Sequence, residues 1–370
     1  MNSILRWLAV AETVDPRQPW KIKHLMGDII AIVFFASLAN ANDWMEIGLF
    51  ALTNERFLLK YLELPHGIPS HDTIQRVFAM VSPDYLQEFR KRWDHTMSGD
   101  GGGRVKRLLG LDGKTQRGNA TSTQKANHIV SAVDDRGFCL GEMRVDEKSN
   151  EITAIPELLR TLNIKGHIIT IDAMGCQTEI AALIKGKRAD YVLALKGNQG
   201  TLHEDVKEYF EDPDLLAGCA YTKTFEKARS SGETREYWQT EDISWLSQKK
   251  DWSGIKSIAM TRNTITKNDV TTTEVRYFIS SLPLNVEEMA WAIRGHWMIE
   301  SYHWHLDVTF REDANQTIEK NSAYNLNIVK KMALNTLKLI DVGVKGISLK
   351  GKRYVICSNF ERFFETIVEL

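Results

Sequence analysis

The spacing of apolar positions in the first hundred residues is that of helices. Asp28 precedes an apolar run and is expected to cap the helix that this run forms. Asn42 or Asp43 is expected to start a second helix, and Ser70 stands before a third. We therefore predict an N-terminal helical domain over residues 1–98.

The pattern changes to short runs of β-forming residues after the glycine-rich segment 98–104, SGDGGGR, which we expect to link two domains. Turn residues separate the first three runs, which predicts an antiparallel meander. Two helix–strand repeats follow and predict that parallel strands extend the same sheet. The five predicted strands are 105–112, 128–134, 138–145, 167–172 and 190–196.

A second strand-rich region, from Cys219 to Leu282, predicts an inserted β subdomain. Helical spacing resumes at Val286 and continues to about His303. The predicted organisation is α/β, with an N-terminal helical domain 1–98, the first part of a sheet-containing domain 99–210, a β-rich insertion 211–284 and a C-terminal helical part 285–370.

Composition is that of an ordinary soluble globular protein, with 43% apolar and 26% charged residues and a formal net charge of -1. This balance gives no overall attraction to nucleic acid, although basic residues cluster locally between residues 90 and 117. The four cysteines are far apart, which fits a reducing cytosol. The longest apolar run is too short to span a bilayer and no export signal is present, so we expect a cytoplasmic protein without a membrane partner.

Asp112 and Asp172 each follow an apolar strand, at the sheet edge where α/β proteins bind ligands. An Asp in this position also commonly starts a turn or caps a helix, and both interpretations stay open. A phosphate-binding loop at Gly113-Lys114-Thr115 is excluded, because Leu108 stands where the loop needs glycine. A tight hairpin at Asp112-Gly113 is disfavoured because the next strand is distant.

Glu300 lies on the last predicted helix, on a face rich in aromatic residues. A carboxylate buried there needs a partner, and a divalent metal held jointly with Asp112 and Asp172 would provide one. The alternative is a surface pair of Glu300 with Arg294 or a histidine. A zinc site is a further alternative, although it lacks the H-E-x-x-H spacing; its ligands would be His296, Glu300, His303 and His305.

Several long blocks of this sequence resemble the H-repeat-associated group of bacterial insertion-sequence transposases, within the DDE superfamily. Among them are LLGLDGKTQRG, ITIDAMGCQ and YVLALKGNQGTLHEDV, and the resemblance runs from about residue 20 to residue 340. It implies an RNase H-like mixed five-stranded sheet with flanking helices and a β-rich insertion. It also implies that Asp112, Asp172 and Glu300 are catalytic and hold two divalent ions, Mg²⁺ or Mn²⁺.

The implied function is two-metal phosphoryl transfer that cuts element ends and joins the 3′-OH to target DNA, by a homodimer on double-stranded DNA at the nucleoid. A degenerate DNA-binding relic and a metal-dependent nuclease are the alternatives. One departure favours degeneration: Arg229, Ser230 and Ser231 replace the His-Gly-Arg triplet of the group. Core packing is expected for Trp297 and Trp304 rather than stacking on bases. The candidate DNA contacts are Lys114, Arg117, Lys196, Asn198, Gln199, Arg294 and His296.

Overall fold

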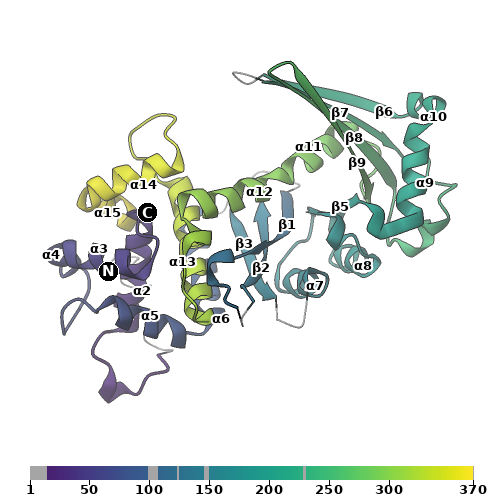
Figure 1. The fold of residues 1–370 in the computed structure, drawn as a ribbon. Coiled ribbons are helices and arrows are strands. Elements are labelled where there is room, and N and C mark those ends of the chain that lie inside the picture. The colour runs from purple at the N-terminus through teal and green to yellow at the C-terminus, as the bar shows by residue number, and fades with distance from the viewer. Residues whose placement is uncertain (1–14, 99–106, 123–124, 146–149, 228–230, 370) are drawn as a thin grey trace. The chain divides into compact units, whose positions relative to one another are not determined.

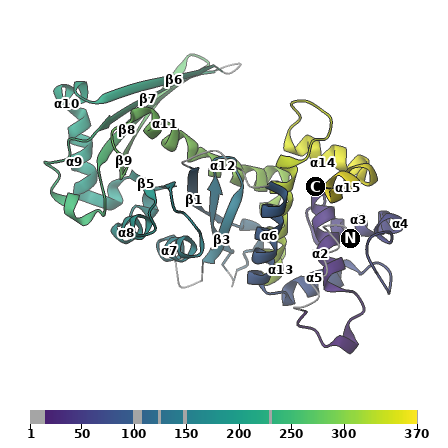
Figure 2. The same cartoon turned by 180° about the vertical axis from the view of Figure 1, so that it is seen from behind.

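The computed structural model describes residues 15–98, 107–122, 125–145, 150–227 and 231–369. The chain forms two units that alternate along the sequence (Figures 1 and 2). The first unit comprises Met1–Gly102, Thr115–His128 and Tyr302–Leu370, and the second comprises Gly103–Lys114 and Ile129–Ser301. None of the helices in the described ranges is long and apolar enough to cross a membrane.

The first unit is helical and is built around α2, all of whose residues are buried. Helix α13 packs against α2, α5 and α6. Asp43 and Ser70 cap α3 and α5, as predicted. Asp28 is not a cap, because α2 begins at Met26; its buried carboxylate accepts a hydrogen bond from the Leu64 amide at 3.1 Å. The helices are α2 (Met26–Leu38), α3 (Trp44–Thr53), α4 (Glu55–Leu58), α5 (His71–Met80), α6 (Pro83–Ser98), α13 (Lys320–Leu339), α14 (Leu349–Ser358) and α15 (Phe360–Glu369).

A buried arginine on α14 closes the carboxyl end of α2. Arg353 is 0% exposed and stacks on Phe310. Its guanidinium donates to the carbonyl oxygens of Ser37, Ala41 and Thr309 and to Oδ1 of Asn42. The last carbonyls of a helix have no partner within the helix, and this side chain satisfies that of Ser37 in α2 together with those of Ala41 and Thr309. Burial lowers the pKa of Arg353 to about 9.

The second unit contains one sheet of nine strands in its described residues, in the order β3-β2-β1-β4-β5-β9-β8-β7-β6. β1, β4 and β5 are parallel, as predicted for the strands that extend the sheet. The predicted number of five is wrong, because β9 pairs antiparallel with β5 and joins the inserted strands to the same sheet. The strands are β1 (Arg107–Thr115), β2 (His128–Asp134), β3 (Cys139–Val145), β4 (His167–Ile171), β5 (Asp190–Leu195), β6 (Ala220–Lys227), β7 (Ser231–Thr240), β8 (Ser257–Lys267) and β9 (Val270–Ser280).

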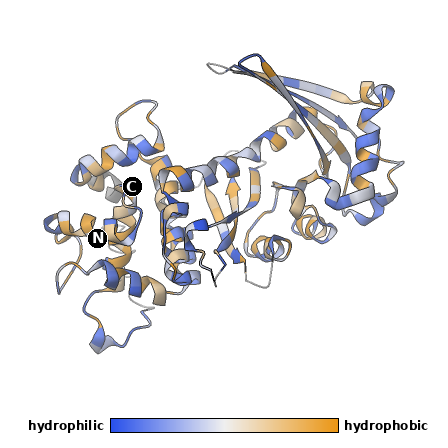
Figure 3. Cartoon of the chain, in the orientation of Figure 1, coloured by the Kyte–Doolittle hydropathy of each residue, from blue (hydrophilic) through white to orange (hydrophobic). Residues whose placement is uncertain are grey.

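Helices cover both faces of this sheet, so the central strands are apolar on both sides, and they carry orange segments in Figure 3. Leu109 and Ile169 belong to the core formed with α7 and α8, whereas Leu108 and Ile168 pack with α11. Alternate residues of a strand point to opposite faces, so these four residues show which face of the sheet each further residue of β1 and β4 occupies. The helices are α7 (Glu151–Thr161), α8 (Thr178–Gly186), α9 (Gly200–Glu211), α10 (Pro213–Ala217), α11 (Val286–Gly295) and α12 (Trp297–Trp304).

The single helix predicted from Val286 to His303 is interrupted at His296. Helix α11 ends at Gly295, where a Cβ atom would lie 2.1 Å from Cδ2 of the buried Leu108. Glycine therefore permits the close approach of this helix to β1. The interruption also allows the chain to change direction before α12.

We predict that Arg353→Met lowers the free energy of unfolding by about 3 kcal/mol or more, because it leaves several buried acceptors without a donor. Urea unfolding followed by circular dichroism measures this. Lys350→Met removes an exposed cation from the same helix and should change stability by less than about 0.5 kcal/mol. Equal effects of the two substitutions would contradict the capping role of Arg353.

Candidate functional site

The parallel pairing of β1 with β4 brings two aspartates side by side. Gly110 pairs with Thr170 and Leu111 with Ile171, so Asp112 and Asp172 occupy the next position in the register. Both lie on the face of the sheet that carries Gly110 and Thr170, because side chains alternate along strands. This is the face covered by α11.

The local structure around the two aspartates differs. β1 continues to Thr115, so Asp112 lies within a strand and the turn predicted as an alternative at Asp112-Gly113 is absent. β4 ends at Ile171, and Oδ1 of Asp172 accepts hydrogen bonds from the amides of Met174 and Gly175 at 3.1 and 3.4 Å. Asp172 therefore does cap a short 3₁₀ turn, Ala173–Gly175, while its carboxylate stays beside Asp112.

The Asp172 carboxyl group is easier to protonate than an ordinary aspartate. Burial and then the negative charge of Asp112 raise the pKa of Asp172, and the hydrogen bond from the Gly175 amide only partly opposes this. Two carboxylates that share a half-buried site repel each other, and a bound cation removes that repulsion.

Glu300 reaches the same cavity from α12. The cavity has a volume of about 410 Å³, and Asp112, Asp172 and Glu300 all line it. One turn before Glu300, Nδ1 of His296 lies 2.9 Å from Oγ1 of Thr170 and anchors the start of α12 to the sheet. Glu300 is exposed. The expectation that it is a buried carboxylate in need of a partner is therefore wrong.

The cavity lies where β9 extends beyond the end of β5. The last residue of β5 in this ladder is Leu195, which pairs with Tyr277, so the preceding residues of β9 have no β5 partner. Their edge, including Glu274 and Arg276, borders the cavity. Lys196, which directly follows β5, is exposed and lines the cavity as well.

Asn198 and Gln199 bind the protein's own backbone. Nδ2 of Asn198 donates to the carbonyl of Ala173 at 2.7 Å, and Nε2 of Gln199 donates to that of Cys176 at 2.6 Å. Both side chains therefore hold the turn that begins with Asp172. That the same two residues contact a DNA phosphate stays a prediction.

The other candidate contacts fall in different places. Lys114 follows Asp112 by two residues on β1 and is partly buried. Arg117 belongs to the first unit, where its Nε lies 4.0 Å from Asp313. Arg294 lies in the last turn of α11, with its guanidinium over the Trp297 ring. Arg229 and Ser230 of the replaced triplet lie outside the described residues.

In the described part of the chain, no three His, Cys, Asp or Glu side chains are close enough to hold one metal ion together. This gives the predicted zinc alternative no support. For the three acids, what the structure shows is a side-by-side aspartate pair and a glutamate on the wall of the same cavity. Trp297 and Trp304 are 40% and 54% exposed, so the expectation that they pack in the core is wrong.

Thr170 was missed by the sequence analysis although a signal was present. It is the one polar residue among the buried positions of the strand HIITI, and it stands two residues before Asp172, on the same face. Its hydrogen bond to His296 explains why a buried strand keeps a hydroxyl at this position.

Comparison with known proteins gives two family matches. Residues 103–336 match the family described as "Transposase DDE domain", and residues 8–94 match the one described as "DDE_Tnp_1-associated". "Putative transposase YncI" of Escherichia coli O157:H7 is 36% identical over 96% of this chain and 92% of its own. "H repeat-associated putative transposase YhhI" of Escherichia coli (strain K12) is 36% identical over 94% and 93%.

We predict that Asp172→Asn stabilises the metal-free protein at neutral pH. An acid whose pKa is raised in the folded state loses its contribution to stability as pH rises through that pKa, so the advantage of Asn grows with pH and vanishes in acid. Asp112→Asn should lower the pKa of Asp172. Urea unfolding in EDTA across the acid range measures both effects.

Asp190→Asn is the matched control, and its expected effect on the free energy of unfolding has the opposite sign. Burial raises the pKa of Asp190, but hydrogen bonds from Lys185 and Ser281 bring it below the ordinary value. Its contribution to stability is present at neutral pH and is lost in acid, so this substitution should destabilise the protein at neutral pH. A loss of stability in both variants would contradict the repulsion between Asp112 and Asp172.

Proposed function

Because this chain belongs to the family described as "Transposase DDE domain", we propose that it cuts the ends of a bacterial insertion sequence and joins each freed 3′-OH to target DNA. Asp112, Asp172 and Glu300 are the catalytic residues of this proposal. The observation that carries it is that all three acids line one cavity, two of them as neighbours in a parallel register. An RNase H-like fold is consistent with the order of the first five strands.

The chemistry of these side chains fits divalent metal ions, because hard cations prefer carboxylate oxygens. In the proposal Asp112, Asp172 and Glu300 would together hold two divalent ions, Mg²⁺ or Mn²⁺. Bound ions would neutralise charge on the reacting phosphate and activate the attacking oxygen. The negative charge of Asp112, which together with burial raises the pKa of Asp172, would then attract the cation.

Two bond exchanges make up the reaction. In the first, a water oxygen bonds to phosphorus at the element end, the bond from phosphorus to the 3′ oxygen breaks, and that oxygen takes a proton. In the second, the new 3′-OH attacks a target phosphate and displaces a 3′ oxygen of the target. Both steps need one phosphate to be held in a fixed orientation beside the acids.

The protein's own groups provide that orientation. Exposed Lys196, on the cavity wall, would contact a phosphate oxygen of the DNA. Lys114, on β1, would approach the same DNA strand. The bond between His296 and Thr170 fixes the start of α12 and with it the position of Glu300. Asn198 and Gln199 hold the turn that orients Asp172.

The remaining parts of the proposal concern assembly. The segment before the catalytic region, matched over residues 8–94, would serve as an accessory DNA-binding part of the protein. Arg117 stays a candidate DNA contact of the first unit. Pairing of two element ends would require two copies of the chain on DNA.

We predict that the purified protein nicks a plasmid carrying the DNA that flanks its own gene when Mn²⁺ or Mg²⁺ is added. Asp112→Asn and Glu300→Gln should each lower the nicking rate by more than about a hundredfold, since even the loss of groups that merely orient a ligand costs up to that much. Glu179→Gln, an exposed acid on α8, is the control and should keep the wild-type rate.

The products distinguish the alternatives. Joined strands, seen by sequencing, support a transposase, whereas nicking without joining identifies a nuclease. If the protein binds the flanking DNA but does not nick it, and calorimetry detects no binding of Mn²⁺ or Mg²⁺, the protein is a degenerate DNA-binding relic. Undiminished nicking by Asp112→Asn would refute the assignment of the catalytic acids.

We further predict that Asn198→Ala weakens Mn²⁺ binding by about 10–100-fold although it removes no ligand, because the turn that orients Asp172 loses its support. Isothermal titration calorimetry measures the affinity, and urea unfolding shows whether the variant remains folded. Unchanged affinity in a folded variant would contradict the orienting role of Asn198.

A further inference from the structure

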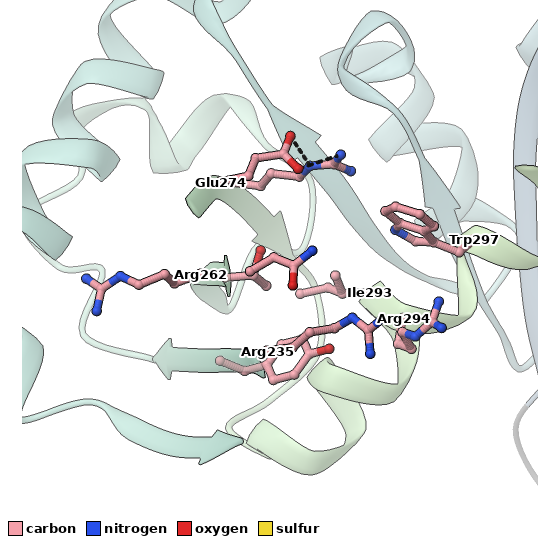
Figure 4. A pocket seen from close by; sticks show the side chains of 10 residues that line it. Arg235, Arg262, Glu274, Ile293, Arg294 and Trp297 are labelled. Atoms are coloured by element: carbon pink, nitrogen blue, oxygen red, sulfur yellow. Dashed lines mark hydrogen bonds and ion pairs between the residues drawn. The ribbon is translucent and has the colours of Figure 1, made fainter. Parts of the chain in front are cut away.

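A second cavity, here called the arginine groove, opens next to the catalytic one. Its floor is the face of the inserted strands that carries Arg235, Asn263, Glu274 and Arg276, and its wall is the junction of α11 and α12, with Arg294 and Trp297 (Figure 4). The register places Arg235, Asn263 and Glu274 in one row across β7, β8 and β9. The same face nearer the sheet's centre is covered by α11.

The arginine groove adjoins the catalytic cavity. Glu274, Arg276 and Trp297 line both. This follows from the free edge of β9, which passes the end of β5 and separates the two cavities by one strand. A polymer that leaves the catalytic cavity along this edge enters the arginine groove.

An anion already lies between two of the arginines. The Glu226 carboxylate is 3.0 Å from Arg235 and 3.8 Å from Arg294. Glu233, which pairs directly with Glu226 across β6 and β7, also contacts Arg235. The Arg294–Glu226 pair is exposed on both sides, and such pairs contribute little to stability, so another anion can replace Glu226 beside Arg294 at small cost. Arg235 is more buried and keeps Glu233 as a second partner.

The size of the groove and its aromatic residue favour a phosphate over a base. Its volume is about 40 Å³, room for roughly three water molecules. The guanidinium groups of Arg276 and Arg294 lie 5.6 and 5.7 Å from the centre of the Trp297 ring. Such cation–π contacts hold the arginines in place, and they occupy surface of the ring that a stacked base would need.

The floor also carries an unsatisfied polar atom. Oδ1 of Asn263 is buried and has no hydrogen-bond partner in the described part of the chain. A buried acceptor without a partner costs about 1–3 kcal/mol. The amide can turn over to present its N–H group, and a phosphate oxygen in the groove would accept from it.

We propose that the arginine groove binds one backbone phosphate of the DNA strand that leads to the reacting phosphate, and that this phosphate displaces Glu226 from Arg235 and Arg294. The inference rests on the proposed function, because it takes the catalytic cavity to hold DNA. It assigns the inserted strands a direct part in holding the substrate, independent of base sequence.

Salt-dependent binding of a fluorescent DNA duplex, in EDTA so that no strand is cut, tests the proposal. Each neutralised phosphate contributes about 0.9 to the slope of log affinity against log salt. Arg294→Ala should weaken binding and lower this slope by about 0.9, equally for flanking DNA and for a scrambled duplex. Arg235→Ala should do the same, and thermal unfolding shows whether its strands remain folded.

Two further variants make the test specific. Arg262 is the matched control. It borders the groove, but its guanidinium extends away from the other labelled side chains (Figure 4), toward Trp238 and Glu236 on the other face of the sheet. Arg262→Ala should leave the slope unchanged. Glu226→Gln should tighten binding at low salt, because the phosphate no longer competes with a carboxylate.

The outcomes separate this inference from the proposed function. Equal slopes for Arg294→Ala and Arg262→Ala, or weaker binding by Glu226→Gln, would overturn the groove assignment and leave the catalytic one standing. Asp112→Asn should bind DNA as well as the wild type and fail to cut it. If Asp112→Asn cuts normally, the catalytic proposal fails whatever the groove variants show.

Discussion

The parallel pairing of β1 with β4 is the constraint on which the candidate site depends. Once Gly110 pairs with Thr170, Asp112 and Asp172 must be neighbours on one face, whatever the repulsion between them. Burial and then the negative charge of Asp112 raise the pKa of Asp172, so ionising this carboxyl group is unfavourable in the folded protein. A fold that maintains such a pair against its own electrostatics gains from it only when a cation or a proton is bound, which is typical of a functional site rather than of a structural one.

The helix that brings the third acid depends on two close approaches to the same strands. Gly295 lets α11 lie against Leu108, and His296 then reaches Thr170 at the point where the helix is interrupted. Glu300 follows one turn later and lines the cavity. The helix is therefore interrupted at the same residue, His296, whose hydrogen bond to Thr170 attaches it to the sheet. This bond helps to set the orientation of α12.

Local sequence patterns predicted what depends on local sequence. Strand order in the first part of the sheet followed from the alternation of apolar runs and helices, and the position of Asp172 from the end of one such run. The union of nine strands could not be predicted, because it depends on β9 pairing with an edge of β5 that is distant in the chain. The exposure of Glu300 was missed because an aromatic helix face was taken to be buried, whereas Trp297 is exposed.

The near-neutral net charge gave little reason to expect a nucleic-acid partner. Binding of a polyanion depends, however, on the charge of the surface that it contacts and not on the net charge of the chain. Alternation along β7, β8 and β9 sends Arg235 and Arg276 to one face and Arg262 to the other. On the first face the arginines converge with Arg294, and two of their partners, Glu226 and Glu274, are exposed glutamates that a stronger anion can replace. A chain whose cations are paired with such carboxylates is neutral overall and still has a local site for a polyanion.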